Sequence, residues 1–261
     1  MNENAGLSPI PSHPIPSHSQ KKLSAIIVAI ETVHKMSYPN CQFYCLTFNN
    51  KNQNNMMERF RKLGIDCLFY DGVPHSDERL ARDKARKRQW SITYGHLDIL
   101  HNFYRDSDKQ YAVVCENDIC IHHDFPQVFK KVLNDFQLMG LDLMLLSYLL
   151  PYQLDANGTF APFTLKARMP EDAVFKYRNY PQYVYGTQMY LVTKEYARKL
   201  LFKCYHDFAG TCDRGFMLEK LFLATQKRAI IYPMLAIEND EQPDPYHQLC
   251  RKVQSRMAEY L

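Results

Sequence analysis

Apolar positions along the chain follow two periods, one typical of strands and one typical of helices. Short runs that are continuously apolar or that alternate with polar residues predict strands at 42–48, 66–70, 111–119, 141–150, 183–192 and 229–237. Apolar residues that recur every three or four positions predict helices at 21–35, 53–63, 90–104, 193–205, 213–225 and after Asp124, which can cap its helix. This alternation predicts an α/β fold, a mostly parallel sheet flanked by helices, with ligands at the carboxyl ends of its strands.

The amino-terminal segment differs from the rest of the chain. The pentapeptide Pro-Ile-Pro-Ser-His occurs twice in succession, at 9–13 and 14–18. Repeated proline removes backbone donors and favours an extended conformation that does not join a core. We therefore expect residues 1–20 to form a flexible tail and residues 21–261 to form a single domain.

Composition adds few constraints. The 261 residues are 46% hydrophobic, as in an ordinary globular protein, and the net charge of +4 is too small to indicate nucleic-acid binding by itself. The eight cysteines form no CxxC pair, so we interpret them as reduced thiols. The longest apolar stretch, 23–30, is too short for a transmembrane segment, and the first residues lack signal-peptide features. These features predict action in the cytoplasm or at the cytoplasmic face of a membrane.

Two carboxylates close together follow the apolar run that begins at Tyr111. Glu116 and Asp118 flank Asn117, and the alternation of a strand would point both acids the same way. Mg²⁺ and Mn²⁺ are commonly held by one or two carboxylates together with phosphate oxygens of a substrate. An isolated triplet of this kind more often marks an acidic turn, but its position at the end of a buried strand favours a metal site.

A series of short motifs covers about residues 41–240. Leu-Thr-Phe-Asn stands at 46–49, an arginine at 59, Tyr-Asp-Gly at 70–72, Tyr-Gly-His-Leu at 94–97, Glu-Asn-Asp at 116–118, Gly-Thr-Gln-Met-Tyr-Leu-Val at 186–192, an acid at 213 and Tyr-Pro-Met-Leu at 232–235. Together they resemble the GT-A glycosyltransferases, most closely family 25, which includes lipopolysaccharide-modifying and procollagen galactosyltransferases. In that family the acidic motif is usually Glu-Asp-Asp, so Asn117 replaces its middle acid.

The resemblance implies a GT-A, Rossmann-like fold and transfer of a hexose from a nucleotide-sugar donor, of the UDP type, to a glycan or glycoconjugate acceptor. It assigns donor-binding roles to eight residues of this chain: Thr47, Asn49, Arg59, Asp71, His96, Glu116, Asn117 and Gln188. Because Asn117 supplies no negative charge, we expect weaker cation binding than in a three-acid motif.

Donor chemistry predicts a divalent cation, Mn²⁺ or Mg²⁺, which assists the departure of the diphosphate. Asp118 is the best direct ligand, and Glu116 either binds the cation through water or holds the ribose. His247 is a further candidate ligand, because many GT-A enzymes place a late His or Asp at this point. Glu238 and Asp240 compete for that role, and a surface histidine is the more frequent alternative.

Inverting transfer, which we expect here, requires a carboxylate that deprotonates the acceptor hydroxyl. Asp213 is the candidate base, although it is placed equally well to cap the predicted helix that it begins. Asp142 and Asp172 are weaker alternatives. The irregular stretch 151–181 is rich in proline and aromatic residues, which is typical either of a lid over a substrate or of ordinary loop packing.

Two other functions compete with glycosyl transfer. The basic segment 79–88 could serve a non-catalytic module that binds phosphate groups, although interspersed acids favour a solvated helix face, and we do not predict a nucleic-acid partner. A metal-dependent nucleotidyltransferase would also use a cation and two carboxylates. The lack of a glycine-rich phosphate loop after the first strand counts weakly against that enzyme.

Overall fold

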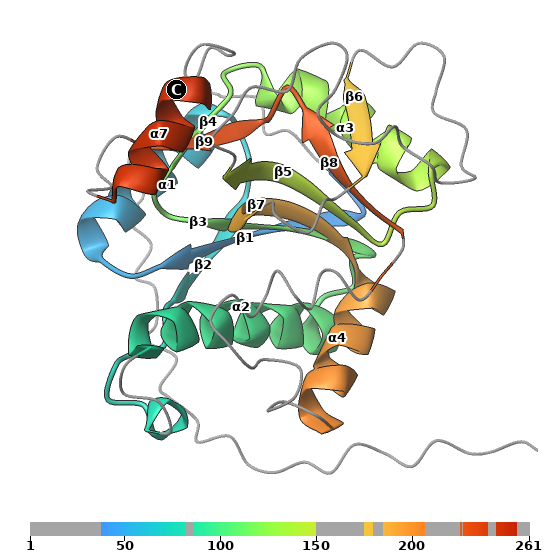
Figure 1. Cartoon of the computed structure of the whole chain (residues 1–261). Coiled ribbons are helices and arrows are strands. Elements are labelled where there is room, and N and C mark those ends of the chain that lie inside the picture. Colours follow the sequence, from blue (N-terminus) through green and yellow to red (C-terminus); the bar gives the residue numbers. More distant parts are fainter. Residues whose placement is uncertain are drawn as a thin grey trace, which may run out of the picture. The chain divides into compact units, whose positions relative to one another are not determined.

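A seven-stranded sheet forms the centre of the described chain (Figure 1). The computed structural model describes residues 38–81, 86–149, 175–179, 185–206, 225, 227–239 and 244–254. In sheet order the strands are β2 (Cys67–Asp71), β1 (Cys41–Thr47), β3 (Tyr111–Glu116), β7 (Tyr185–Thr193), β5 (Leu143–Leu149), β8 (Arg228–Tyr232) and β6 (Lys176–Asn179). Strands β2, β1, β3, β5 and β8 run in one direction, whereas β7 and β6 run in the other. The predicted α/β fold with a mostly parallel sheet is confirmed.

Helices cover both faces of this sheet. In Figure 1, α2 (Lys87–Asp106) and α4 (Lys194–His206) lie on one face, and α3 (Phe125–Leu138) lies on the opposite one, where α1 (Asn50–Lys62) also packs. Along β3, Ala112 and Val114 join the core of the α2 face, while Val113 and Cys115 join the core of the other face. Burial on both sides explains why the central strands are continuously apolar. None of the helices in the described ranges is long and apolar enough to cross a membrane.

The first strands and helix form the predicted βαβ unit, since β1 and β2 are parallel and α1 connects them. Helix α1 begins where the side-chain oxygen of Asn49 accepts a hydrogen bond of 2.8 Å from the backbone N–H of Asn52. Helix α2 lies very close to β1, because a Cβ at Gly95 would come within 2.7 Å of a Leu46 methyl group. A larger residue at this position would require the Leu46 side chain to move.

Two predicted strands are each divided in the structure. The run 111–119 ends as a strand at Glu116, and a turn at Asn117 and Asp118 leads into β4 (Ile119–Ile121). The run 229–237 is split into β8 and β9 (Ala236–Glu238), with Pro233, which has no N–H to donate, between them. Strands β4 and β9 pair antiparallel in a separate small sheet. The expected alternation of Glu116 and Asp118 on one strand is therefore wrong.

Besides the short 3-10 helix η1 (Glu78–Leu80), one strand and one helix were not predicted. Strand β6 lies inside the stretch that we expected to be irregular, and α7 (Pro245–Gln254) follows the last predicted strand. Of the four residues of β6, Tyr177 is the only apolar one, so the strand carries almost no hydrophobic pattern. The predicted helices 21–35 and 213–225, the tail 1–20 and most of 151–181 lie outside the described residues.

Candidate functional site

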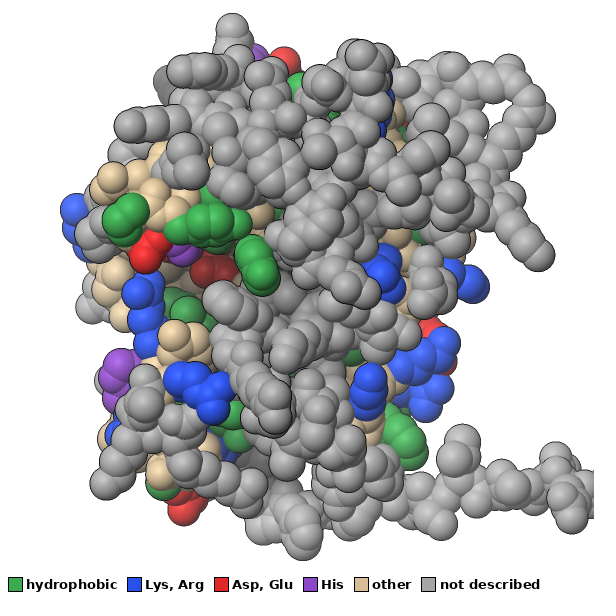
Figure 2. Space-filling model, viewed as in Figure 1, with side chains coloured by type: hydrophobic (Ala, Val, Ile, Leu, Met, Phe, Trp, Pro, Cys, Tyr) green, Lys and Arg blue, Asp and Glu red, His purple; other side chains and the backbone are tan. Residues whose placement is uncertain are grey.

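The carboxyl ends of β1, β2 and β3 bring three predicted donor-binding residues to one edge of the sheet. Thr47 ends β1, Asp71 ends β2 and Glu116 ends β3, and Thr47 lies opposite Asp71 in the parallel register. The Thr47 hydroxyl donates to the Tyr70 carbonyl at 3.1 Å and lies 3.5 Å from an Asp71 carboxylate oxygen. On the face drawn in Figure 2, acidic and histidine side chains gather beside hydrophobic ones, near the ends of β1 and β2 in the same view of Figure 1.

Glu116 is the centre of a chain of polar contacts. Its Oε1 accepts a 2.6 Å hydrogen bond from the Thr187 hydroxyl of β7 and lies 3.5 Å from His96 Nε2 of α2. The His96 ring is fully buried, and its Nδ1 lies 3.2 Å from the Tyr190 hydroxyl of β7. Three elements thus fix the position of this carboxylate.

The surroundings of Glu116 also keep it ionised. Burial raises the pKa of this carboxyl group, but the contacts with His96 and Thr187 and the nearby charge of His247 lower it more, so the pKa lies below its usual value. The Glu116 carboxylate is therefore negatively charged at neutral pH and fixed in position at the carboxyl edge of the sheet.

Two amide side chains beside Glu116 have buried polar atoms that no described residue satisfies. Asn117 and Gln188 are each only 4% exposed, and Asn117 Nδ2 and Gln188 Oε1 have no hydrogen-bond partner in the described ranges. Gln188 is on β7 at the position next to Met189, which pairs with Cys115, so it faces the end of β3. An unsatisfied buried group costs about 1–3 kcal/mol. A water or a ligand that accepts from Asn117 and donates to Gln188 would remove this cost.

Asp118 lies next to a histidine–carboxylate pair contributed by β9 and α7. The Asp118 carbonyl accepts a 2.7 Å hydrogen bond from the Asn239 N–H, immediately after Glu238. His247 Nδ1 lies 2.7 Å from both carboxylate oxygens of Glu238. The hydrogen bond with Glu238 raises the pKa of His247. Burial lowers this pKa in part, and the negative charges of Glu238, Asp244 and Asp118 raise it further. His247 is thus within electrostatic range of both predicted carboxylate ligands.

The side chains of the predicted ligands Glu116, Asp118 and His247 are of types that bind divalent cations, but their ligand atoms do not all lie close enough to surround an ion by themselves. Histidines that bind metals usually give their other ring nitrogen to a carboxylate, as His247 does with Glu238, which would leave Nε2 for the ion. Within the described ranges, the only group of three possible ligand atoms that lie within 4.8 Å of one another is His122, His123 and Asp124. A cation at Asp118 would therefore need substrate oxygens to complete its coordination.

The remaining predicted residues have structural partners or lie elsewhere. Asn49 caps α1, and Arg59 Nη1 donates at 2.5 Å to the Ile119 carbonyl, which holds the backbone just after Asp118. Asp142 directly precedes β5, at the amino ends of the parallel strands and thus away from Glu116. It accepts a hydrogen bond of 2.7 Å from the Thr225 hydroxyl. Three predicted acids lie outside the described residues: Asp172, Asp213 and Asp240.

Part of the basic segment is engaged within the protein. The guanidinium of Arg79 donates to Asp77 and Asp98 at about 3 Å and lies 4.9 Å from the centre of the Tyr94 ring. Lys87 Nζ donates to the His75 carbonyl at 3.2 Å. Because these basic side chains already have partners within the protein, the contacts favour a solvent-exposed helix face and argue against a patch that binds phosphate groups.

Sequence reasoning missed Thr187 and Tyr190 as partners of the buried Glu116–His96 pair, and it missed the cluster at 122–124. Thr187 and Tyr190 lie within the motif at 186–192, but the apolar pattern of a strand does not indicate which polar side chains will contact each other. The cluster had a visible signal, because His-His-Asp is consecutive in the sequence.

No protein-family model and no curated protein matches this chain. Solved structures similar to it include A197 from STIV, with 12% identity and a TM-score of 0.41, over 78% of this chain and 92% of that one. A glycosyltransferase involved in glycosylation of the PBCV-1 major capsid has 8% identity and a TM-score of 0.41, over 82% and 99%. A Bacillus anthracis protein assigned as a glucose-1-phosphate thymidylyltransferase has 10% identity and a TM-score of 0.34, over 79% and 75%. All three similarities are weak.

Gly186, at the start of β7, allows the Gln188 side chain to fold back over it. Its φ is +101°, and a Cβ there would lie 2.0 Å from Gln188 Oε1. We expect Gly186→Ala to lower the free energy of unfolding by about 1–3 kcal/mol and to displace the Gln188 amide. Urea unfolding measures the loss.

Gly140→Ala is the matched control, because φ is +59° there and a Cβ would have no atom within 4 Å. It should lose only the backbone contribution, about 1 kcal/mol. Equal losses at the two positions would show that the contact with Gln188 contributes nothing.

Proposed function

We propose that this chain is a metal-dependent glycosyltransferase of the GT-A type, which transfers a hexose from a UDP-type donor to a glycan or glycoconjugate acceptor. The observation that carries the proposal is the ionised Glu116, held in place by its neighbours and followed two residues later by Asp118, at the carboxyl edge of a mostly parallel sheet. Ligands of open α/β sheets bind at this edge. The motif resemblance of the sequence supports the same activity.

The two carboxylates have different surroundings and therefore different proposed roles. Glu116 Oε1 is engaged by Thr187 and lies near His96, so this side chain is suited to hold a fixed position at the ribose or at a water ligand of the cation. Asp118 lies in the turn after β3, where its carboxylate is suited to direct coordination. When bound, Mn²⁺ or Mg²⁺ would stabilise the charge that develops on the departing diphosphate.

The neighbouring side chains orient the donor in this proposal. Gln188 Oε1 would accept a hydrogen bond from a hydroxyl group of the sugar or ribose, and Asn117 would contact the donor through its side-chain oxygen, an acceptor that Asn117→Asp retains. Glu238 would hold His247 through Nδ1, so that Nε2 coordinates the cation. Asp213 remains the proposed base of an inverting transfer, and we propose action in the cytoplasm or at the cytoplasmic face of a membrane.

A thermal-shift screen of nucleotide-sugars with and without Mn²⁺ tests the function. A ligand that binds only the folded chain raises the melting temperature by mass action. We expect UDP-sugars to do so only with Mn²⁺, and the selected donor to release UDP when acceptor glycans are added. Asn117→Asp is the matched variant, in which we expect turnover to be retained and the cation to bind more tightly.

The screen also separates the competing functions. Stabilisation by polyanions that is independent of Mn²⁺ and weakens steeply with salt would indicate a binding module. Conversion of a nucleoside triphosphate and a sugar 1-phosphate to pyrophosphate and a nucleotide-sugar would indicate a nucleotidyltransferase. Either result would overturn the glycosyltransferase proposal.

A further inference from the structure

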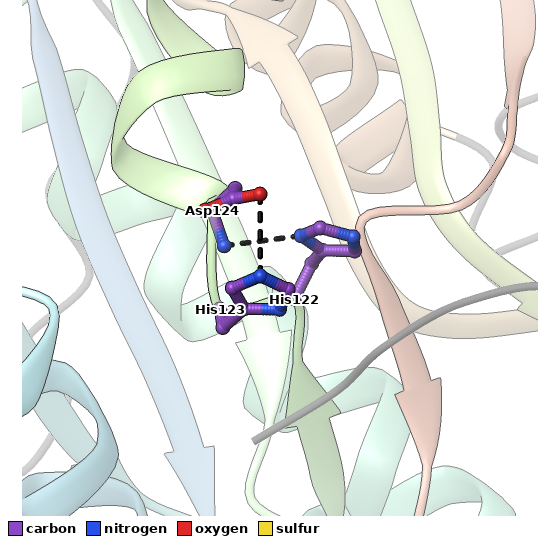
Figure 3. Close-up of side chains that lie close together, drawn as sticks. All are labelled: His122, His123 and Asp124. Carbon is purple, nitrogen blue, oxygen red and sulfur yellow. Dashed lines mark hydrogen bonds and ion pairs between the residues drawn. The ribbon is translucent and has the colours of Figure 1, made fainter.

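His122, His123 and Asp124 form a compact cluster between β4 and α3 (Figure 3). One possible ligand atom of each side chain lies within 4.8 Å of the other two. The two imidazole rings are stacked, with centroids 4.7 Å apart and an interplanar angle of 16°. Three metal-ligating side chains thus meet at a site separate from Glu116 and Asp118.

The carboxylate of Asp124 does not perform the task that its position suggests. Asp124 stands at the N-cap of α3, yet it makes no side-chain capping bond, so the expected cap is wrong. Its φ and ψ of −85° and 11° are far from the extended conformation that capping residues normally adopt. The carboxylate instead lies 3.2 Å from His123 Nε2.

We propose that this His122–His123–Asp124 cluster binds a divalent transition-metal ion of the Zn²⁺ type. Zinc is bound by histidine nitrogen at about 2.0–2.1 Å and by carboxylate oxygen at about 2.0–2.2 Å, commonly with tetrahedral geometry. Two ligand atoms at these distances and tetrahedral angles are about 3.3 Å apart. The separation of 3.2 Å between His123 Nε2 and Asp124 Oδ2 already matches this value.

The donor set also separates this site from the proposed catalytic cation. Two imidazoles and one carboxylate favour Zn²⁺, Ni²⁺ or Cu²⁺, whereas Mg²⁺ and Mn²⁺ favour oxygen ligands. The three residues of β4 lie between Asp118 and His122, which places the two sites about 10 Å apart or more. The cluster can therefore bind metal whether or not the chain is a glycosyltransferase.

The local contacts limit the affinity. His122 Nδ1 accepts a 3.1 Å hydrogen bond from the Asp124 N–H, so coordination through this atom must displace that bond. His123 and Asp124 are exposed, which leaves the remaining coordination positions to water. Exchangeable binding follows, weaker than the very tight binding of a closed zinc site.

Bound metal would connect α3 to the small sheet. The His122 N–H donates to the Leu235 carbonyl at 3.0 Å, just before β9, and α3 begins at the residue after Asp124. A metal ion at the cluster would hold this junction in its folded arrangement. It should therefore raise the melting temperature of the chain as well as bind to it.

The test titrates ZnCl₂ into the full-length, chelator-stripped chain by calorimetry, with the melting temperature as a second readout. We expect one equivalent of Zn²⁺ to bind at this cluster and the melting temperature to rise by about 5 °C when Zn²⁺ is about 100 times Kd. His123→Gln removes a side chain that is 41% exposed and should fold normally, while zinc affinity falls about 10-fold or more. The double variant His122→Ala and His123→Ala should lose this equivalent entirely.

Two controls make the result specific. His75→Ala removes an exposed histidine outside the cluster and should bind zinc as the wild-type chain does. Asp118→Asn should also keep zinc binding, although it loses the proposed Mn²⁺ dependence. Unchanged zinc binding in the double variant would overturn the proposal and assign the metal to other histidines of the chain.

Discussion

Asp118→Asn should lower glycosyl transfer by about 10³-fold or more, because stabilisation by a metal ion contributes several kcal/mol to the transition state. Folding should be retained, since the hydrogen bond that joins this residue to Asn239 uses the Asp118 carbonyl and not its side chain. Initial rates at saturating donor across a range of Mn²⁺ concentrations measure the effect. The urea midpoint of the same preparation verifies the fold.

A second substitution one residue away is the control for this result. Asn117→Asp restores an acid to the middle of the motif without altering Asp118, so rates near wild type are expected, with a lower Mn²⁺ requirement. Wild-type turnover with full Mn²⁺ dependence in Asp118→Asn would remove Asp118 from the metal site.

Phe129→Ala should lower the free energy of unfolding by about 3–5 kcal/mol, the usual loss for a fully buried phenylalanine. The Phe129 ring contacts Tyr38, Phe43 and Phe125 at centroid distances of 5.2, 5.3 and 4.9 Å and thereby packs α3 against β1. Such a loss is a large part of the total stability of a typical domain, about 5–15 kcal/mol. Urea unfolding followed by circular dichroism measures it.

Leu138→Ala is the matched control on the same helix, because Leu138 is 65% exposed. Its loss should stay within about 0.5 kcal/mol. Similar losses for the two variants would mean that α3 does not pack through Phe129.

The sequence predicted well the parts of the fold that repeat a local pattern. The βαβ unit and helices α2, α3 and α4 follow from apolar periodicity, and Thr47, Asp71 and Glu116 meet because parallel strands end at one edge. The break after Glu116 was not predicted, since the apolar pattern continues through Ile119 and Ile121 on the far side of a two-residue turn.

The contacts that define the site depend on long-range packing. Thr187 and Glu116 are 71 positions apart, and His96 and Tyr190 are 94 positions apart. Periodicity assigns each of them to a strand or a helix but does not say which polar side chains will touch. Similarly, nothing local in the sequence indicates that the Asp124 carboxylate turns toward His123 instead of capping α3.

Because β7 runs opposite to its neighbours, its first residues lie at the carboxyl edge of the sheet, and this affects how the site can change during evolution. Most binding residues of an open parallel sheet are carried by loops, which tolerate insertions and deletions. Thr187 and Gln188 instead lie in β7 directly before the residues that pair with β3, from Met189 to Thr193, and beside an irregular part of the ladder with β5, so the strand that carries this wall of the site is anchored by the β3 ladder just after it. An inserted or deleted residue would shift every later side chain of β7 to the opposite face of the sheet. Changes of specificity at this wall are therefore expected to arise by replacement of side chains one at a time, while changes of length are confined to the connections outside it.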